Sequence, residues 1–416
     1  MARQDARLTL NDSLELIPIS LGPDTSVYMS TRAAWVPGGD LPWGDLPGDL
    51  PLPLHTATYG AHVYAMAGAA VLRSAAAARE SAGVSGNGEG SSVLGLHTIQ
   101  GCFTSRGLGD RPFLFTVTRI SSGRSLATYS LTVRQPTTPS TAPSVRFPRS
   151  DASRPLGPVC FTALVTLKAP EPSPVRVQAP SPQTLHSSIL SSRPPSSWPL
   201  CPQVDIDIVN AIFPDQGQGR FPILDMRKVD MTEYNSARPP TGRKEILLYR
   251  LLEPTGGGAG EEDGKGEEEL GNEHILAHAF AADRNGLLML CRDFDFGWSP
   301  GAVATVSWSF YVHVNASEAV MRRSGGRGRV AGNYAGSGAA GTGAGVASDG
   351  DGEDDGWWVL EDSFERAEAG RGFMVGRIFS PEGVHVATAV QDGIARALAE
   401  MSEGGRESGK EKKGRL

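Results

Sequence analysis

The chain has 416 residues, of which 39% are hydrophobic and 20% are charged, and its formal net charge is -7. This length is enough for two or three domains, and the negative charge argues against a nucleic-acid surface, which needs a basic face. No apolar run approaches the roughly 20 residues that cross a bilayer, and the N-terminus lacks the layout of a signal peptide. We therefore expect an intracellular, soluble protein with no membrane span.

The first half of the sequence predicts one long helix with strands before and after it. An alanine-rich helix is expected at Gly60–Glu80, because alanine is the best helix former. Around it, alternating and apolar patterns predict strands. They lie at 14–21, 27–35, 93–103, 112–120, 126–135 and 159–167.

The second half repeats this plan after a linker rich in Pro and Ser. A second helix is expected from an N-cap at Asn272 through residue 290. Further strands are expected at 223–229, 245–252, 303–314 and 357–365. We interpret the repeat as an internal duplication. The predicted domains are 1–175 and 216–398, with a linker at 176–215, a glycine-rich insertion at 321–356 and a charged tail at 399–416.

A hairpin near the C-terminus is the clearest local pattern. Two alternating runs, Phe373–Phe379 and Val384–Val390, flank the turn residues Ser380–Gly383. This pattern predicts two antiparallel strands with one buried face, and Gln391 leaves the second strand. A similar hairpin in the first half ends at Gln135.

Other motifs and the four cysteines do not predict a metal or nucleotide site. His274 and His278 have zinc-ligand spacing, but Ile275 replaces the Glu of HExxH and no third ligand is in view. The segment 336–341 matches GxGxxG without a strand before it or a helix after it. Cys102, Cys160, Cys201 and Cys291 are far apart, which predicts free thiols.

Several segments, in this order, resemble the acyl-CoA thioesterase II (TesB-like) family. They are TYGAHVYAMAGAAVLRSA, GLHTIQGCFTSRGLGDRPFLFTVTRISSGRSLATYSLTVRQ, VCFTALVTLKAPEP, AFAADRNGL, TVSWSFYVHV and GRGFMVGRIFSPEGVHVATAVQDGIAR. The resemblance covers most of residues 15–395 and marks the chain as a divergent, fungal-type member. It implies an α+β fold, the tandem (double) hotdog, in which an antiparallel sheet wraps a long helix in each half.

In this family an Asp, a Ser or Thr, and a Gln position a water that attacks the thioester carbonyl. The resemblance places the Gln at Gln391, the Asp position at Ser307 and the Ser/Thr position at Glu365. Because serine is a poor base, we expect Glu365 to take the base role. The alternative is a solvated Glu365 that pairs with Arg366 or Arg371.

Helix starts are the expected oxyanion sites, because their unpaired N–H groups favour negative charge. The candidates are the starts at Gly60–His62 and Asn272–His274. Gly60, His62 and His97 are the predicted substrate contacts, with a packed histidine as the alternative for His62. Asp283, an acid on a mostly apolar helix, is expected to hydrogen-bond across the interface between the halves or to polarise the site.

The predicted reaction is hydrolysis of a fatty acyl-CoA to the free acid and CoA, with no metal or other cofactor. One alternative is a catalytically impaired acyl-CoA-binding protein, motivated by the two changed positions. The other is a dehydratase-like hotdog, which needs a His–carboxylate pair that the sequence does not place. The expected partner is the acyl-CoA substrate, and a homo-oligomer stays open. Gly414-Arg415-Leu416 approaches a peroxisomal import signal, so peroxisome and cytosol are the expected compartments.

Overall fold

The structure is a computed structural model that describes residues 7–43, 57–81, 93–143, 146–252, 266–293, 300–322 and 356–397. The predicted insertion at 321–356, apart from its ends, and the predicted tail at 399–416 lie outside these residues. The GxGxxG segment at 336–341 lies outside them as well.

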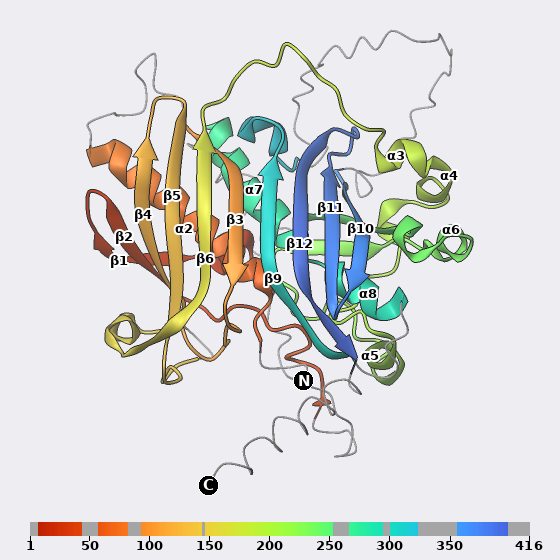
Figure 1. Cartoon of the computed structure of the whole chain (residues 1–416), viewed down its shortest axis with the longest axis horizontal. Helices are drawn as coiled ribbons and strands as arrows, with labels where there is room; N and C mark the ends of the chain where they lie inside the picture. Colours follow the sequence, from red (N-terminus) through yellow and green to blue (C-terminus); the bar gives the residue numbers. More distant parts are fainter. Residues whose placement is uncertain are drawn as a thin grey trace.

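The strands of the described residues form one antiparallel sheet (Figure 1). Those of the first half are β1 (Leu16–Leu21), β2 (Thr25–Ser30), β3 (Gly95–Phe103), β4 (Leu114–Ser122), β5 (Leu126–Pro136) and β6 (Leu156–Lys168). Those of the second half are β7 (Leu224–Lys228), β8 (Glu245–Leu251), β9 (Pro300–Val312), β10 (Trp358–Glu368), β11 (Arg371–Phe379) and β12 (His385–Ala397). The predicted strands are confirmed, with ends that differ by a few residues.

The strand order confirms the internal duplication. Along the sheet the order is β1-β2-β4-β5-β6-β3-β9-β12-β11-β10-β8-β7. If β1–β6 are matched in turn to β7–β12, this order reads the same from either end. The two halves meet where β3 pairs with β9, as in Thr98 opposite Tyr311 and Gly101 opposite Trp308. The limits of the two domains and of the linker stay predictions.

Two long helices pack behind the centre of the sheet (Figure 1). They are α2 (Gly60–Ser81) and α7 (Glu267–Ala281). They approach closely at Gly68, where a Cβ atom would lie 2.5 Å from Leu276 Cδ2. Because α2 buries alanine and glycine on most sides near its start, it can lie against both the sheet and α7.

The predicted second helix is wrong in its extent. Instead of one helix from Asn272, α7 begins at Glu267, and a break separates it from α8 (Gly286–Asp293). Asn272 is not a cap: its side chain accepts from the Leu96 amide at 2.7 Å and donates to the Leu94 carbonyl at 3.1 Å. The break follows from Asn285, whose φ of 65° is left-handed and ends a right-handed helix.

The segment between the halves is packed rather than free. After β6 the chain crosses to the β7–β10 end of the molecule (Figure 1). There it forms α3 (Pro182–Leu185), α4 (Ser187–Leu190), η3 (Pro195–Ser197) and α5 (Asp207–Ile212), before β7. The remaining short helices are α1 (Leu10–Ser13), η2 (Arg149–Ser153), α6 (Thr232–Ser236), η4 (Pro240–Gly242) and η5 (Ala316–Ala319). Composition suggested a linker because it does not show that Trp198, Cys201 and Val204 are buried.

The C-terminal hairpin is confirmed. β11 and β12 pair antiparallel, and Gly383 takes a φ of 82° in the connecting turn. Inward residues such as Met374 and Ile378 are buried, whereas Phe373 on the other face is 41% exposed. α8 packs on the buried face, where Gly372 and Gly393 leave room for Leu290 and Leu287.

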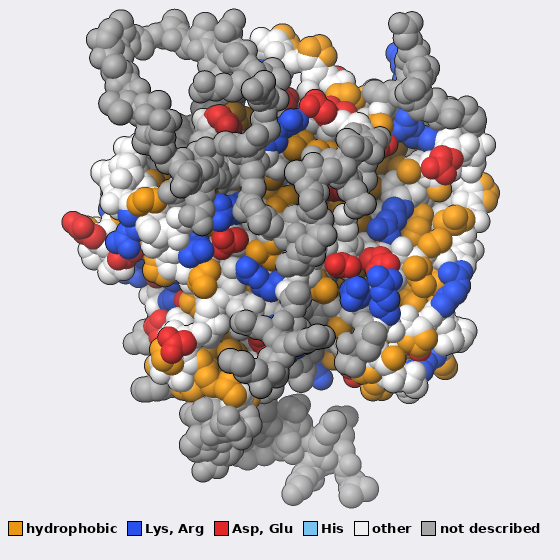
Figure 2. Space-filling model, turned by 180° about the vertical axis from the view of Figure 1, so that it is seen from behind, with side chains coloured by type: hydrophobic (Ala, Val, Ile, Leu, Met, Phe, Trp, Pro, Cys, Tyr) orange, Lys and Arg blue, Asp and Glu red, His pale blue; other side chains and the backbone are white. Residues whose placement is uncertain are grey.

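The face behind the sheet carries acidic and basic side chains interspersed with apolar ones (Figure 2). Among the helices of the described residues, none combines the length and the apolar character that a membrane span requires. The predicted free thiols are also found: Cys160, Cys201 and Cys291 are buried, and Cys102 is partly exposed.

Candidate functional site

Gln391 is the centre of a polar cluster on the inner face of the sheet. It lies on β12, and its side chain is 4% exposed. Its Nε2 donates to Asp283 Oδ1 and to Thr305 Oγ1, at 2.6 Å in each case. A carboxylate, a hydroxyl and an amide from three separate segments therefore meet at one point.

A β-bulge on β9 puts Thr305 in this cluster. Trp308 pairs with Gln391 and Ser307 with Asp392, but the next pair is Thr305 with Gly393, so Val306 is an extra residue. Since directly opposite residues share a face, the extra residue turns Thr305 to the Gln391 side. The sequence pattern did not point to Thr305, because simple alternation does not show a bulge.

Asp283 joins the cluster from the break between α7 and α8. Its Oδ2 accepts from the Ala61 amide at the start of α2, at 3.0 Å. This contact bridges the two halves, as was expected for Asp283. Burial raises the pKa of Asp283 to about 6, although the Ala61 and Gln391 hydrogen bonds and the charge of Arg284 oppose the change. A carboxylate with this pKa is suited to accept a proton near neutral pH.

Part of the polar cluster is accessible to solvent. Gln391 is buried, but Asp283 and Thr305 are only half-buried. The start of α8 lies beside them, since a Cβ on Gly286 would be 2.5 Å from Gln391 Oε1. The first N–H groups of a helix lack intrahelical partners and favour negative charge. This helix start differs from both starts that the sequence suggested: the Ala61 amide is engaged by Asp283, and Asn272 lies inside α7.

The structure does not bring Ser307 and Glu365 to Gln391, which corrects the predicted catalytic set. Ser307 pairs with Asp392 and so faces the opposite side of the sheet from Gln391. Glu365 is exposed, at an irregularity in the pairing of β10 with β11. The Glu365 position came from a count back from Arg371 without gaps, and such a count fails here because Glu365 is itself an extra residue in β10.

Of the three predicted substrate contacts in the first half, Gly60 borders the site, and His62 and His97 do not. Gly60 borders the site, where a Cβ would lie 3.1 Å from Asp283 Oδ2. His62 is 1% exposed; its Nδ1 accepts from the Trp35 amide and its Nε2 lies 2.9 Å from the Ser13 carbonyl. This is the packed alternative, and burial lowers the pKa of His62 to about 4. His97 lies at a register shift near the start of β3, away from the Gly101–Trp308 pair beside Gln391.

The first half carries no equivalent cluster in the part of it that the structure describes. β6, the topological counterpart of β12, buries Phe161, Ala163, Val165 and Leu167. Gln135 lies on β5, which corresponds to β11, so the predicted parallel with Gln391 is wrong. Its side chain instead bonds the Leu108 amide and carbonyl at 2.8 Å and the Arg111 carbonyl at 3.2 Å, which secures a loop.

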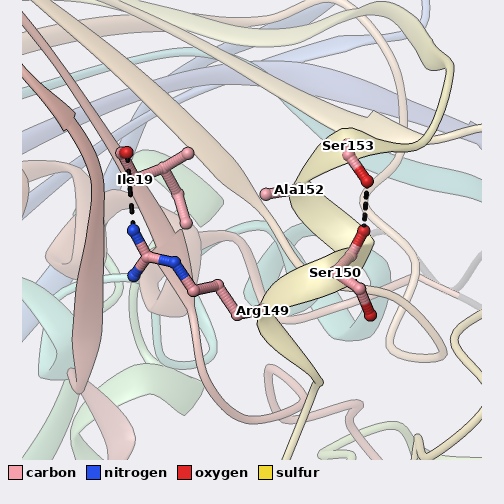
Figure 3. Close-up of a pocket in the computed structure, with 5 residues that line it drawn as sticks. All are labelled: Ile19, Arg149, Ser150, Ala152 and Ser153. Carbon is pink, nitrogen blue, oxygen red and sulfur yellow. Dashed lines mark hydrogen bonds between the residues drawn. The ribbon is translucent and has the colours of Figure 1, made fainter.

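A surface hollow lies elsewhere, beside β1 and η2 (Figure 3). Ile19, Arg149, Ser150, Ala152 and Ser153 line it. Ser153 donates to the Ser150 carbonyl at 2.7 Å, so this hydroxyl is already engaged within η2. The described residues also contain no group of three or more His, Cys, Asp or Glu arranged as a metal site.

Comparison with solved structures identifies the architecture. An acyl-CoA thioesterase II, TesB2, from Mycobacterium marinum superposes with a TM-score of 0.51 at 15% identity, over 93% of this chain and 97% of that one. A hot dog fold protein of unknown function from Alicyclobacillus acidocaldarius gives a TM-score of 0.51 at 12% identity, over 93% and 98%. The chain has the double hotdog fold. No protein-family model and no curated protein sequence matches it.

The predicted and observed sites can be separated by mutation. Ser307→Ala and Glu365→Gln are each expected to leave any acyl-CoA turnover of this double hotdog protein within about twofold of the parent, because surface changes of this kind have small effects. Steady-state rates of the purified variants test this. A loss of tenfold or more in either variant would return that residue to the mechanism.

Proposed function

We propose that this double hotdog protein hydrolyses an acyl thioester of coenzyme A, with Asp283, Thr305 and Gln391 as its catalytic residues. The observation that carries the proposal is the Gln391 amide, which joins a carboxylate and a hydroxyl at 2.6 Å each. An acceptor with a pKa of about 6 and a hydroxyl can together bind one water, and the amide fixes their geometry.

The proposed reaction uses a single water. Asp283 accepts a proton as the water oxygen attacks the thioester carbonyl carbon and forms a tetrahedral intermediate. The N–H groups at the start of α8 stabilise the oxyanion. The intermediate collapses, the carbon–sulfur bond breaks, and the proton held by Asp283 passes to the departing thiolate of CoA, which restores the carboxylate. The products are the free acid and CoA, and this route needs no metal or redox cofactor.

The test is release of CoA from a series of acyl-CoAs by the purified protein. Free CoA is best measured by chromatography, because the free cysteines of the chain would react with a thiol reagent. We expect release in proportion to enzyme concentration, with a preferred acyl length that the series identifies. Absence of release above buffer for every member of the series would contradict the proposal.

The reaction rate should depend on pH through Asp283. Because the charged carboxylate is the base, kcat is expected to rise as pH increases through about 6, the pKa of Asp283, and to level off above it. A kcat–pH profile from pH 4.5 to 8.5 measures the midpoint. A rate that is flat over this range, with chemistry shown to be rate-limiting, would exclude Asp283 as the base.

The alternative of a catalytically impaired acyl-CoA-binding protein rested on the changes at Ser307 and Glu365. Neither residue is part of the observed cluster, and that cluster contains an acid, a hydroxyl and an amide. The alternative therefore loses its motivation. Tight acyl-CoA binding without CoA release would restore it.

A further inference from the structure

The residues that follow Asp283 are held by a buried polar network. Arg284 is 3% exposed and Asn285 is 4% exposed, and both lie in the break between α7 and α8. Burying such groups is costly unless their donors are satisfied. Many of their partners come from the segment between the halves, which composition had suggested to be a linker.

Asn285 connects the break to two carboxylates. Its Nδ2 lies 2.9 Å from Asp205 Oδ2 and 2.6 Å from Glu245 Oε1, and 3.6 Å from Cys201 Sγ. Asp205 belongs to the segment between the halves, and Glu245 belongs to β8. The side chain therefore holds a left-handed residue against both the segment and the sheet.

The two carboxylates are themselves neutralised. Arg292 on α8 contacts Glu245 and lies 2.6 Å from Asp205 Oδ2, and Lys228 on β7 contacts Asp205 and lies 3.6 Å from Glu245. Two buried acids thus face two cations, so each charge has a partner. The Arg292 contacts also attach α8 to the same network.

Arg284 fixes the other side of the break. Its guanidinium donates to the Gln203 carbonyl at 3.0 Å and to the Pro202 carbonyl. It also lies over the ring of Phe221, 4.5 Å from its centroid, a favourable cation–π arrangement. Arg284, the residue next to Asp283, is therefore held by the backbone of the segment between the halves.

We propose that residues 201–206 form a brace that positions Asp283 for the proposed reaction, through their contacts with Arg284 and Asn285. Asp283 lies outside both helices, so its backbone depends on the break, and the break depends on these contacts. The inference rests on the proposed function, because it assigns the brace a role in that reaction. Asn285 is a positioning residue, since its contacts reach the site only through the chain.

Asn285→Gly tests the brace. Glycine takes a left-handed φ without strain, so the variant keeps the turn and loses only the bridge from Nδ2. Because small misplacements of a reacting group are costly, we expect kcat to fall about 10- to 100-fold with little change in KM. Looser packing also exposes Asp283 to solvent, so the midpoint of the kcat–pH profile should move below that of the parent.

Asn272→Ala is the matched control. Asn272 is also a buried asparagine, also 4% exposed, and it joins α7 to the backbone at Leu94 and Leu96. We expect this variant to unfold at a lower temperature while it keeps the parent kcat and pH midpoint. If Asn285→Gly does not fold, Asp205→Ala, which removes one acceptor of the Asn285 amide and leaves Glu245 as the other, should still lower kcat several-fold.

The outcomes are distinguishable. If the parent releases CoA and folded Asn285→Gly matches its kcat and pH midpoint, the brace is rejected and the proposed function stands. An equal fall in kcat for Asn272→Ala would also reject the brace, because the effect would then be general destabilisation. A parent that releases no CoA overturns both proposals.

Discussion

Gln391→Ala is expected to lower kcat about 100- to 1,000-fold. The amide of Gln391 donates to both Asp283 and Thr305, so its loss removes the group that holds the carboxylate and the hydroxyl together. Removal of one preorganised donor from an active site typically has an effect of this size. The measurement is kcat at saturating acyl-CoA, with far-ultraviolet circular dichroism to confirm the fold.

Gln135→Ala is the matched control for this variant. Gln135 is 7% exposed and bonds backbone groups of a loop, so its loss should lower the unfolding temperature and leave kcat near that of the parent. A Gln391→Ala variant within a few-fold of the parent would show that the cluster does not perform the chemistry. In the double variant with Asp283→Asn, the effects are expected not to multiply, because residues that act together are not additive.

Asp283→Asn is expected to stabilise the fold at neutral and alkaline pH while it removes activity. The folded-state pKa of Asp283 is about 6, against an ordinary value of 3.8, so the folded protein binds the proton more tightly than the unfolded chain does. Stability is therefore lost as pH rises from about 4 to about 6. The loss is up to about 3 kcal/mol, less what solvent screening of the half-buried carboxyl removes. Asparagine carries no charge and escapes this loss.

Urea unfolding of the parent and of Asp283→Asn at pH 4 and pH 8 measures the effect. The free energy of unfolding of the variant should exceed that of the parent at pH 8 and equal it at pH 4. Asp392→Asn serves as the control, because Asp392 lies on the outer face and pairs with a largely exposed Arg371 at 2.6 Å; its effect should stay below about 1 kcal/mol. A variant with the same advantage over the parent at both pH values would contradict the raised pKa.

Local sequence patterns predicted much of the architecture. Alanine content predicted α2, alternation and turn residues predicted β11 and β12, and their repetition predicted two related halves. These features depend on contacts within one element or between neighbours in sequence, and such preferences are present in the residues themselves. The family resemblance placed Gln391 in the site, and the structure finds it inside β12.

The composition of the site was decided by the tertiary structure. Thr305 reaches Gln391 only because Val306 is an extra residue in β9, and alternation does not reveal a bulge before the strand has a partner. Asp283 meets the Ala61 amide across 222 positions of the chain, and its pKa comes from burial that no neighbour in sequence provides. The sequence by itself determined the strands, the first long helix and their order, and its resemblance to a family supplied one candidate residue, Gln391. The faces, the partners and the protonation behaviour required the packed fold, because each depends on contacts between distant segments.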